Sequence, residues 1–170
     1  EEIRRARRDR ATVAVLVLDL DHFKAVNDGY GHLAGDCVLA AVAGELRGGV
    51  RQHDLVGRFG GEEFVVLLPG LPSGAGGRAE LTVVAERLRR RIADLEVSVA
   101  ARGPGRSAGT RTISGLSVSV GGAAVPLDGQ DLEQVMRAAD AALYAAKRAG
   151  RNLVRIAAAA DVPTPRRPPA

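Results

Sequence analysis

The sequence predicts one α+β domain built around an antiparallel sheet. Three observations indicate this class: a short, β-branched apolar run from Val13 to Leu18, a strand–turn–strand pattern centred on Gly60-Gly61, and segments of helical periodicity between the strand-like runs. The chain has 170 residues, of which 46% are hydrophobic, so it can form one ordinary core.

The first half of the chain alternates strand-like and helical segments. Val13–Leu18 is predicted to be a buried strand, and apolar residues at helical spacing predict a helix from Cys37 to Leu46. Leu55–Phe59 and Phe64–Leu68 flank Gly60-Gly61-Glu62-Glu63 and predict a hairpin. After a glycine-rich loop, an apolar face at helical spacing predicts a second helix over residues 81–92.

The second half predicts two strands, a helix and a last strand. Residues 96–100 and 112–120 alternate well enough to be strands, separated by a turn over residues 103–109. Asp131, with Gln134 three residues on, predicts a capping box that opens a helix, and Gly150 predicts its end. Residues 153–156 predict a short final strand. The whole order is that of a ferredoxin-like or palm-type fold, a βαββαβ core with flanking helices and an extra C-terminal helix and strand.

Composition limits the domain organisation and the partners. We expect a helix or linker from an upstream module over residues 1–11, the folded domain over residues 12–157 and a disordered tail over residues 158–170. The net charge of +4 comes from arginines concentrated at the two ends, which favours solvated flanks over a polyanion-binding patch. Only 3% of residues are aromatic, so little stacking on bases is available and no nucleic-acid partner is expected.

The cellular location is predicted from cysteine content and hydropathy. A lone Cys37 cannot form an internal disulfide, which fits a reducing cytosol. No apolar run approaches the roughly 20 residues that span a bilayer, so this domain is expected to make no membrane contact. We therefore expect a cytoplasmic protein, or the cytoplasmic domain of a larger and membrane-anchored one.

Four carboxylates occur at the ends of strand-like segments. Asp19 and Asp21 end the first apolar run on one side of the strand, because side-chain direction alternates, and Glu62-Glu63 lie at the tip of the hairpin. Gly60 and Gly61 leave room for close approach to the backbone, and crowded glutamates are costly without a cation. The pattern predicts a site for divalent metal and phosphate. The alternatives are exposed turn carboxylates and, for Asp21, a structural hydrogen bond.

Three blocks of the sequence resemble the GGDEF-domain diguanylate cyclases, which condense two GTP molecules into cyclic di-GMP. The blocks run from Asp19 to Asp36, from Arg58 to Phe64 and from Asp140 to Asn152. The second reads Arg-Phe-Gly-Gly-Glu-Glu-Phe, with Glu in place of the Asp of the family's name. One departure is that the Asp-x-Leu-Thr-Gly-Leu-x-Asn-Arg segment usual before the first strand is absent.

The resemblance implies a two-metal phosphoryl transfer. Asp19, Glu63 and the carbonyl of Leu20 are the expected ligands of two Mg²⁺ or Mn²⁺ ions per active site. Glu62 is either a further ligand or the base that takes the proton of the attacking 3′-hydroxyl. Asn27 and Asp36 are implied to recognise guanine. For Asp36 the sequence also allows an N-cap of the helix that starts at Cys37.

Triphosphate binding is implied for the C-terminal block. Lys147 and Arg151 are four apart and so predicted to share a helix face, although cations at a helix C-terminus are favourable in any case. Backbone amides around Phe23 and Lys24, together with Gly60 and Gly61, complete the expected phosphate contacts. The side chains of the phenylalanines Phe23, Phe59 and Phe64 are expected in the core.

A second site is implied for the product. Arg51 and Asp54 precede the hairpin at the spacing of the family's inhibitory site, where they would bind cyclic di-GMP, with Arg87 as a second arginine. The alternative is an ordinary surface ion pair between Arg51 and Asp54.

The expected enzyme is a homodimer in which two domains face one another, each holding one GTP. A sensory or dimerisation domain is expected upstream in the full-length protein. Two other classes stay open: a catalytically silent GGDEF domain that acts as a receptor for GTP or cyclic di-GMP, and a nucleic-acid-binding palm-like domain, which only the basic pI supports.

Overall fold

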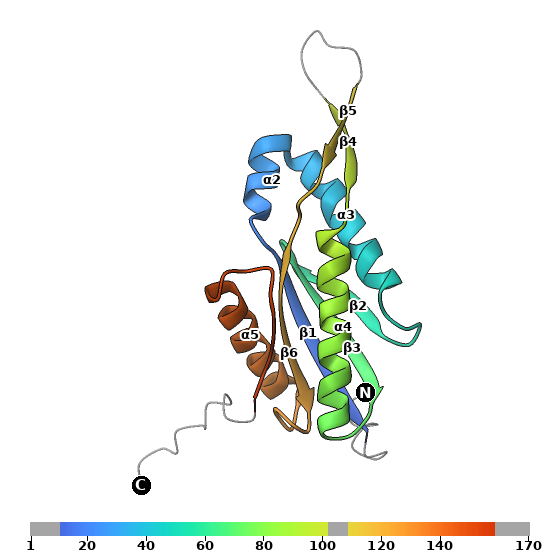
Figure 1. The fold of residues 1–170 in the computed structure, drawn as a ribbon, viewed down its shortest axis with the longest axis vertical. Helices are drawn as coiled ribbons and strands as arrows, with labels where there is room; N and C mark the ends of the chain where they lie inside the picture. The colour runs from blue at the N-terminus through green and yellow to red at the C-terminus, as the bar shows by residue number, and fades with distance from the viewer. Residues whose placement is uncertain (1–10, 102–108, 159–170) are drawn as a thin grey trace.

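A five-stranded sheet forms the centre of the computed structural model, which describes residues 11–101 and 109–158. The strand order is β2-β3-β1-β6-β7, with all pairs antiparallel except β6 with β7 (Figure 1). A separate two-stranded ribbon, β4-β5, extends beyond one end of this sheet. The strands are β1 (Thr12–Leu20), β2 (Leu55–Gly60), β3 (Glu63–Leu71), β4 (Val97–Ala101), β5 (Gly109–Ile113), β6 (Val118–Val125) and β7 (Val154–Ile156).

The helices complete the predicted βαββαβ order. They are α2 (Phe23–Tyr30), α3 (His32–Gly48), α4 (Ala75–Ala93) and α5 (Leu132–Arg148). The sheet order of β2, β3, β1 and β6 is that of a ferredoxin-like fold, and α5 and β7 follow as the extra C-terminal elements. The predicted fold class is therefore confirmed.

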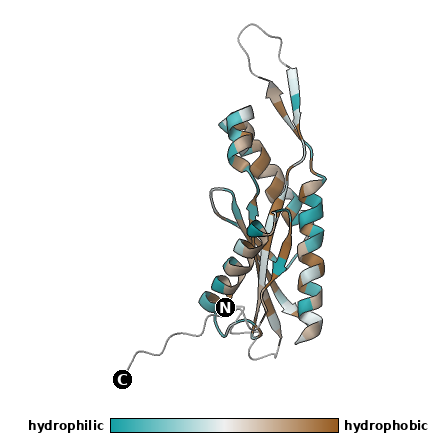
Figure 2. Cartoon of the chain, turned by 60° about the vertical axis from the view of Figure 1, so that its left-hand side comes forward, coloured by the Kyte–Doolittle hydropathy of each residue, from teal (hydrophilic) through white to brown (hydrophobic). Residues whose placement is uncertain are grey.

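The central strand β1 is buried on both faces and separates two apolar clusters. Ala14, Leu16 and Leu18 point to the cluster that includes residues of α3 and α4. Val15 and Val17 point to the cluster that includes residues of α5. Helices α3, α4 and α5 pack with one face inward, and in Figure 2 the helices accordingly carry both hydrophobic and hydrophilic residues.

Close approach of α5 to β6 depends on Gly121. A Cβ atom at this position would overlap the backbone of Ala139 and Leu143 in α5. Because Gly121 pairs with Val17 on β1, the glycine lies on the face of the sheet that α5 covers. The contact brings α5 close to the side of β1 that also carries Asp19.

Helix α2 is missing from the sequence-based prediction, and α3 begins earlier than predicted. His22, in the left-handed conformation (φ 57°), precedes α2, and Gly31 (φ 88°) separates α2 from α3. Helix α3 starts at His32 rather than Cys37, so Asp36 lies inside the helix. The N-cap alternative for Asp36 is therefore wrong.

The predicted strand over residues 112–120 is two strands. β5 ends at Ile113 and β6 begins at Val118, with Gly115 in a positive-φ conformation (φ 71°) between them. The start of α5 is as predicted: Asp131 Oδ1 accepts a hydrogen bond from Gln134 N at 2.9 Å. The return bond differs, because Gln134 Oε1 accepts from Gln130 N instead.

Some predictions concern segments outside the described residues. These are the entry helix or linker over residues 1–10, the tail over residues 159–170 and most of the turn over residues 103–109. No helix in the described ranges is long and apolar enough to cross a membrane.

Candidate active site

The hairpin tip and the end of β1 form one acidic cluster. The register of β1 and β3 places Asp19 directly opposite Glu63, and Gly61 (φ 43°) makes the turn that precedes Glu62. Leu20 N donates to the carbonyl of Glu62 at 3.2 Å, which fixes the turn to the end of β1. The structure thus brings Asp19, Glu62 and Glu63 together, as the sequence predicts.

Lys147 compensates part of this negative charge. Its Nζ lies 2.7 Å from Oδ2 of Asp19, whose side chain is only 10% exposed. Burial raises the pKa of Glu62, the charges of Asp19 and Glu63 raise it further, and Lys147 opposes the shift. The cluster is therefore one in which an additional cation would be favourable.

The donor set of the cluster fits a hard divalent cation. Carboxylate and backbone carbonyl oxygens are the ligands that Mg²⁺ prefers, and Glu62 is the group whose raised pKa a nearby cation would lower. Across residues 11–101 and 109–158, no three His, Cys, Asp or Glu side chains already form a metal-binding group. Asp19 Oδ2 is paired with Lys147 in this geometry, so a metal ion bound by Asp19 would share or compete for this carboxylate.

Arg58 supports the hairpin turn, a role that the sequence analysis missed. Its Nε and Nη2 both donate to the carbonyl of Gly61, at 2.9 and 2.6 Å. Two bonds from one guanidinium to one carbonyl fix the turn just before Glu62. The signal in the sequence was the arginine two residues before Gly60.

A cavity of about 530 Å³ adjoins the cluster, between the hairpin tip and the helices α2 and α3. It contains the two residues implied to recognise guanine, Asn27 and Asp36. Gly35 lets Asn27 pack against α3, because a Cβ at Gly35 would overlap Asn27 Oδ1. The other lining residues are Phe23, Lys24, Asp28, His32, Leu39, Arg58, Gly61 and Glu62.

Two of the three phenylalanines are in the core. Phe23 and Phe64 are buried, as predicted, but Phe59 is 71% exposed. Phe59 lies on the edge strand β2, where the pairing with β3 is irregular between Arg58 and Gly60. An edge strand leaves one side uncovered, so the prediction for Phe59 is wrong.

Asp21 makes structural hydrogen bonds, which was one of the two possibilities left open. Its carboxylate accepts from Ser117 Oγ at 2.9 Å, from Ser119 Oγ at 2.7 Å and from Asn152 N at 3.0 Å. These donors come from the segment before β6, from β6 itself and from the turn after α5.

Arg151 does not share a helix face with Lys147. α5 ends at Arg148, and Arg151 follows in a turn with φ 64°. The i, i+4 argument is wrong because the helix ends before Arg151. Both residues remain near the C-terminal end of α5.

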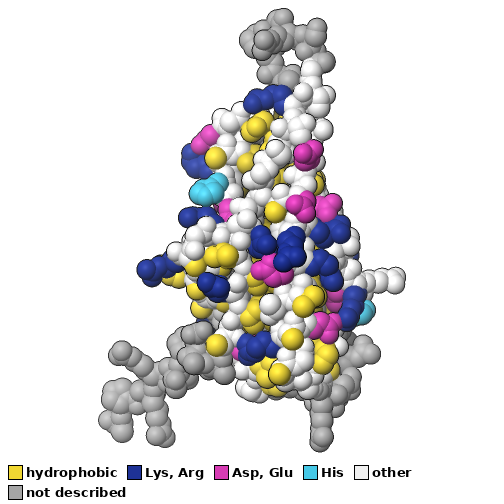
Figure 3. All heavy atoms as spheres, viewed as in Figure 1, with side chains coloured by type: hydrophobic (Ala, Val, Ile, Leu, Met, Phe, Trp, Pro, Cys, Tyr) yellow, Lys and Arg dark blue, Asp and Glu magenta, His cyan; other side chains and the backbone are white. Residues whose placement is uncertain are grey.

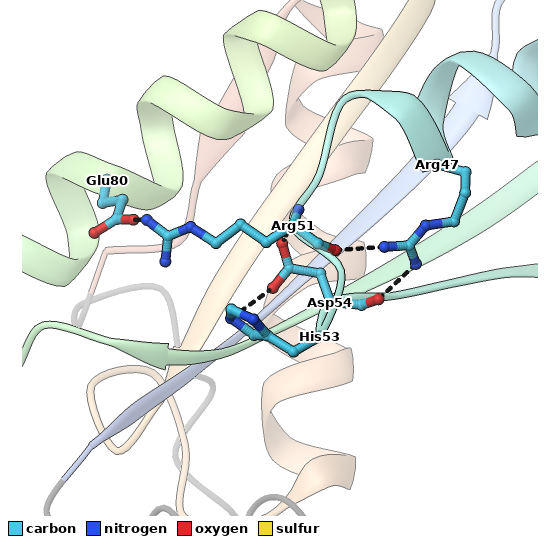
Figure 4. Close-up of polar contacts among 5 residues, drawn as sticks. All are labelled: Arg47, Arg51, His53, Asp54 and Glu80. Atoms are coloured by element: carbon cyan, nitrogen blue, oxygen red, sulfur yellow. Dashed lines mark hydrogen bonds and ion pairs between the residues drawn. The ribbon is translucent and has the colours of Figure 1, made fainter.

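A second cavity, of about 430 Å³, contains Arg51, Asp54 and Arg87. In Figure 4 the guanidinium of Arg51 meets Glu80 of α4, with Nη2 2.5 Å from Oε1. The Asp54 carboxylate instead accepts from the backbone N of Arg51 at 2.7 Å. The alternative of an ordinary surface pair is wrong, since the two side chains do not pair with one another.

Arg47 closes the same turn, and the sequence analysis did not identify it. Its guanidinium donates to the carbonyls of Arg51 and Asp54, the latter at 2.6 Å (Figure 4). Arg87 donates from Nε to the carbonyl of Gly49 at 3.1 Å. Arg47 of α3 and Arg87 of α4 therefore both donate hydrogen bonds to backbone carbonyls of the segment between α3 and β2.

Charges of both signs mix on the face that carries α4. Figure 3 shows Lys and Arg side chains beside Asp and Glu side chains on this face. On α4, Arg89 and Arg90 pair with Glu86, and Arg91 pairs with Glu45 of α3.

Comparison with known proteins agrees with this arrangement. The sequence profile of the family described as "Diguanylate cyclase, GGDEF domain" matches residues 1–153. The chain is 43% identical over 158 residues to diguanylate cyclase DgcP of Pseudomonas aeruginosa. The aligned region covers 92% of this chain but only 21% of DgcP. The chain thus spans about a fifth of the length of this curated relative.

Two solved structures share the fold. The active GGEEF domain of a diguanylate cyclase from Vibrio cholerae is 29% identical, with a TM-score of 0.74 over 92% of this chain and 89% of that one. The GGDEF domain of DgcB from Caulobacter crescentus, in complex with c-di-GMP, is 31% identical, with a TM-score of 0.73 over 91% of this chain and 83% of that one. With most of its length matched by the family profile and with this fold and acidic hairpin, the chain belongs to the GGDEF domain family of diguanylate cyclases.

Proposed function

We propose that this domain condenses two molecules of GTP into cyclic di-GMP and two pyrophosphates, with Mg²⁺ or Mn²⁺ as cofactor. The observation that carries the proposal is the cluster of Asp19, Glu62 and Glu63 beside a cavity that Asn27 and Asp36 line. The Vibrio cholerae neighbour is an active domain with the same Gly-Gly-Glu-Glu-Phe motif, so Glu62 is compatible with catalysis.

The carboxylates of Asp19 and Glu63 would hold two metal ions per site, with the carbonyl of Leu20 as a further ligand. Bound divalent ions would activate the 3′-hydroxyl and neutralise the leaving pyrophosphate. Glu62 would act as a ligand or as the base for the hydroxyl proton. The position of Glu62, beside Asp19 and Glu63 at the hairpin tip, is compatible with either role.

The cavity between α2 and α3 would take the guanine base. Asp36 is exposed within α3 and lines the cavity, so its carboxylate can accept from the N1–H and N2–H₂ donors on one edge of guanine. An adenine at the same place would leave that carboxylate unpaired. Mismatches of this kind can discriminate by roughly 10⁴-fold.

The triphosphate would lie along the end of the sheet towards α5. Lys147 and Arg151 would supply the positive charge, and the backbone amides at Phe23 and Lys24 would bind phosphate oxygens. Gly60 and Gly61 would allow the phosphates to approach the hairpin closely. Lys147 would bind a phosphate after release from Asp19.

One active site holds one GTP, so condensation would need two domains that face one another. We also propose that the domain works in the cytoplasm under control of an upstream sensory or dimerisation domain. The matched segment is only 21% of DgcP, which supports the presence of further domains in a full-length protein.

The cavity with Arg51, Asp54 and Arg87 would bind cyclic di-GMP and slow the enzyme. The Caulobacter crescentus neighbour was solved in complex with c-di-GMP, and a guanidinium can bind a phosphate through two parallel hydrogen bonds. In this chain Arg51 would have to leave Glu80 first. Asp54, with a side chain only 4% exposed, would have to rearrange its turn to accept from guanine.

The direct test is incubation of the protein with GTP and Mg²⁺, followed by mass analysis of the products. Cyclic di-GMP is expected from the wild type, and Glu63→Gln should lose turnover by orders of magnitude while remaining folded. Glu133→Gln is the matched control, because Glu133 is an exposed glutamate of α5, away from the hairpin. Unchanged turnover in Glu63→Gln would refute the metal assignment. GTP binding without any product would favour the silent receptor.

Protein concentration tests the facing arrangement. The initial rate per milligram should rise with concentration and reach a plateau once dimers dominate. A rate per milligram that is constant in a protein shown to be monomeric would exclude this mechanism.

A further inference from the structure

The turn after α5 has an unusual backbone. Gly150, Arg151 and Asn152 have φ values of 119°, 64° and 47°, so two consecutive non-glycine residues adopt the left-handed conformation. Side chains rarely adopt this conformation, and a turn of this kind persists only where its surroundings hold it. The contacts of Asn152 therefore decide where Arg151 lies.

The first contact is with the residue that follows β1. Asp21 is buried, at 7% exposure, and its Oδ2 accepts from Asn152 N at 3.0 Å. The hydroxyls of Ser117 and Ser119 also donate to this carboxylate, at 2.9 and 2.7 Å. These three donors satisfy the buried Asp21 carboxylate and fix its position. Asp21 lies two residues after Asp19, so the two side chains point to the same side of the chain.

The second contact comes from α4. Arg89 Nη1 donates to Asn152 Oδ1 at 2.7 Å, and Arg89 Nε donates to Glu86 Oε2 at 3.0 Å. The Arg89 side chain is 18% exposed, so its position is restricted by packing as well as by Glu86. Asn152 is thus held at its backbone by Asp21 and at its side chain by Arg89.

We propose that Arg89 and Asp21 are positioning residues for triphosphate binding, acting through Asn152 on the backbone that carries Arg151. The inference rests on the proposed function, which assigns Arg151 to the triphosphate. Because Asp21 lies only two residues after Asp19, the contacts of Asn152 with Asp21 and Arg89 fix the turn that carries Arg151 relative to the acidic cluster. Arg89 itself touches neither the acidic cluster nor the guanine cavity in any contact described above.

Arg89→Ala is the main test, because Asp21→Asn removes a buried anchor and can prevent folding. Two ligands are titrated by calorimetry: a GTP analogue with a methylene group between the α- and β-phosphorus atoms, which cannot be condensed, and guanosine, which has no phosphate. We expect Arg89→Ala to weaken analogue binding roughly five-fold, as for one lost hydrogen bond, and to leave guanosine binding unchanged.

Arg90→Ala is the matched control. Arg90 is the next residue of α4, lies 3.9 Å from the same Glu86 carboxylate and has a 73% exposed side chain. This variant should bind both ligands as the wild type does. Arg89→Lys, which keeps one donor towards Asn152, should recover part of the lost affinity.

A double variant tests whether Arg89 acts through Arg151. In the Arg151→Ala background, Arg89→Ala should cost no further affinity for the analogue, because the group that it positions is already gone. The inference is overturned if Arg89→Ala weakens guanosine and the analogue equally, or if its full effect persists in the Arg151→Ala background.

The same titrations separate this inference from the proposed activity. A wild type that binds the analogue but yields no cyclic di-GMP from GTP refutes condensation and leaves the positioning role to be decided by the variants. If the wild type binds the GTP analogue no more tightly than guanosine, the triphosphate contributes no affinity and the positioning role is overturned.

Discussion

Lys147 Nζ lies 2.7 Å from Asp19 Oδ2, which joins the last turn of α5 to the end of β1. The ammonium group neutralises a carboxylate that is largely buried between the two elements. A divalent cation bound by Asp19 would compete with this ammonium group for the charge of the same carboxylate. The pair therefore links the metal affinity of the site to the position of one lysine.

Lys147→Met should destabilise the metal-free protein and strengthen its response to Mg²⁺. We expect a loss on the order of 1 kcal/mol, because the lysine is partly solvated and its partner is left unpaired. Melting temperature with and without Mg²⁺ measures the effect: the increase on adding Mg²⁺ should be larger in the variant than in the wild type. Arg137→Met, a change at an exposed cation of the same helix, is the control. Equal increases in all three proteins would contradict competition between Lys147 and the metal ion for Asp19.

Glu62→Gln should stabilise the metal-free protein at neutral pH. The pKa of Glu62 is raised by burial and by Asp19, so the folded state disfavours the charged form. The contribution of Glu62 to the free energy of unfolding is fully present below the pKa that it has in the unfolded chain. It is lost as the pH rises through the higher pKa that it has in the folded protein. The neutral glutamine avoids this loss. Melting temperatures should therefore differ at about pH 7.5 and converge towards about pH 4, near the ordinary glutamate pKa. A difference that grows on acidification would have the wrong sign.

Asp36→Ala should lose guanine selectivity with little change in stability. Asp36 is exposed and lies inside α3, so no cap is removed and the free energy of unfolding should change by less than about 0.5 kcal/mol. The ratio of kcat/KM for GTP and ATP measures selectivity. Asp28→Ala changes another acid of the same cavity, one paired with Lys24, and should have the smaller effect. A ratio unaltered in Asp36→Ala would exclude recognition of guanine by this carboxylate.

Glu80→Gln should make the enzyme more sensitive to its product, and Arg51→Ala less sensitive. The first change frees Arg51 from its acidic partner, a contact worth up to roughly 1 kcal/mol, and so should tighten binding by up to about five-fold. The second removes the phosphate-binding group. Initial rates against added cyclic di-GMP give both effects. Asp54→Ala is a poorer probe, because the buried carboxylate also holds the turn through Arg51 N. The same inhibition in wild type and both variants would eliminate this cavity as the product site.

The sequence predicted the elements with strong apolar periodicity. β1, the β2–β3 hairpin, α4 and α5 each present a long apolar face or run. Because the carboxylates lie at the ends of these strand-like segments, the sequence could group Asp19 with the hairpin glutamates. Helix α2 has only eight residues, with Phe23 buried and Val26 partly buried against the core, so its apolar pattern is too short to stand out in the sequence. A break such as that at Gly115 gives a similarly weak signal, because the residues on both sides of it favour strands.

The pairing of side chains could not be predicted in the same way. Lys147 reaches Asp19 because α5 packs closely on Gly121, a contact between segments far apart in the chain. Arg51 meets Glu80 because α4 crosses beside the α3–β2 turn. Arg151 was misplaced because the i, i+4 spacing was carried past the predicted helix end at Gly150, and the chain there turns with positive φ values.

The two-sided burial of β1 limits which changes of chain length the domain can tolerate. A single residue inserted or deleted between Val13 and Leu18 would turn every later side chain of the strand to the opposite face. Leucines would then enter the acidic cluster, and Asp19 would be buried among the apolar residues of α3 and α4. Changes of chain length should therefore be tolerated only outside β1, in segments that do not pair within the sheet. In β1, the gain or loss of a single residue would disrupt the packing of the core and would also move the Asp19 carboxylate out of the acidic cluster.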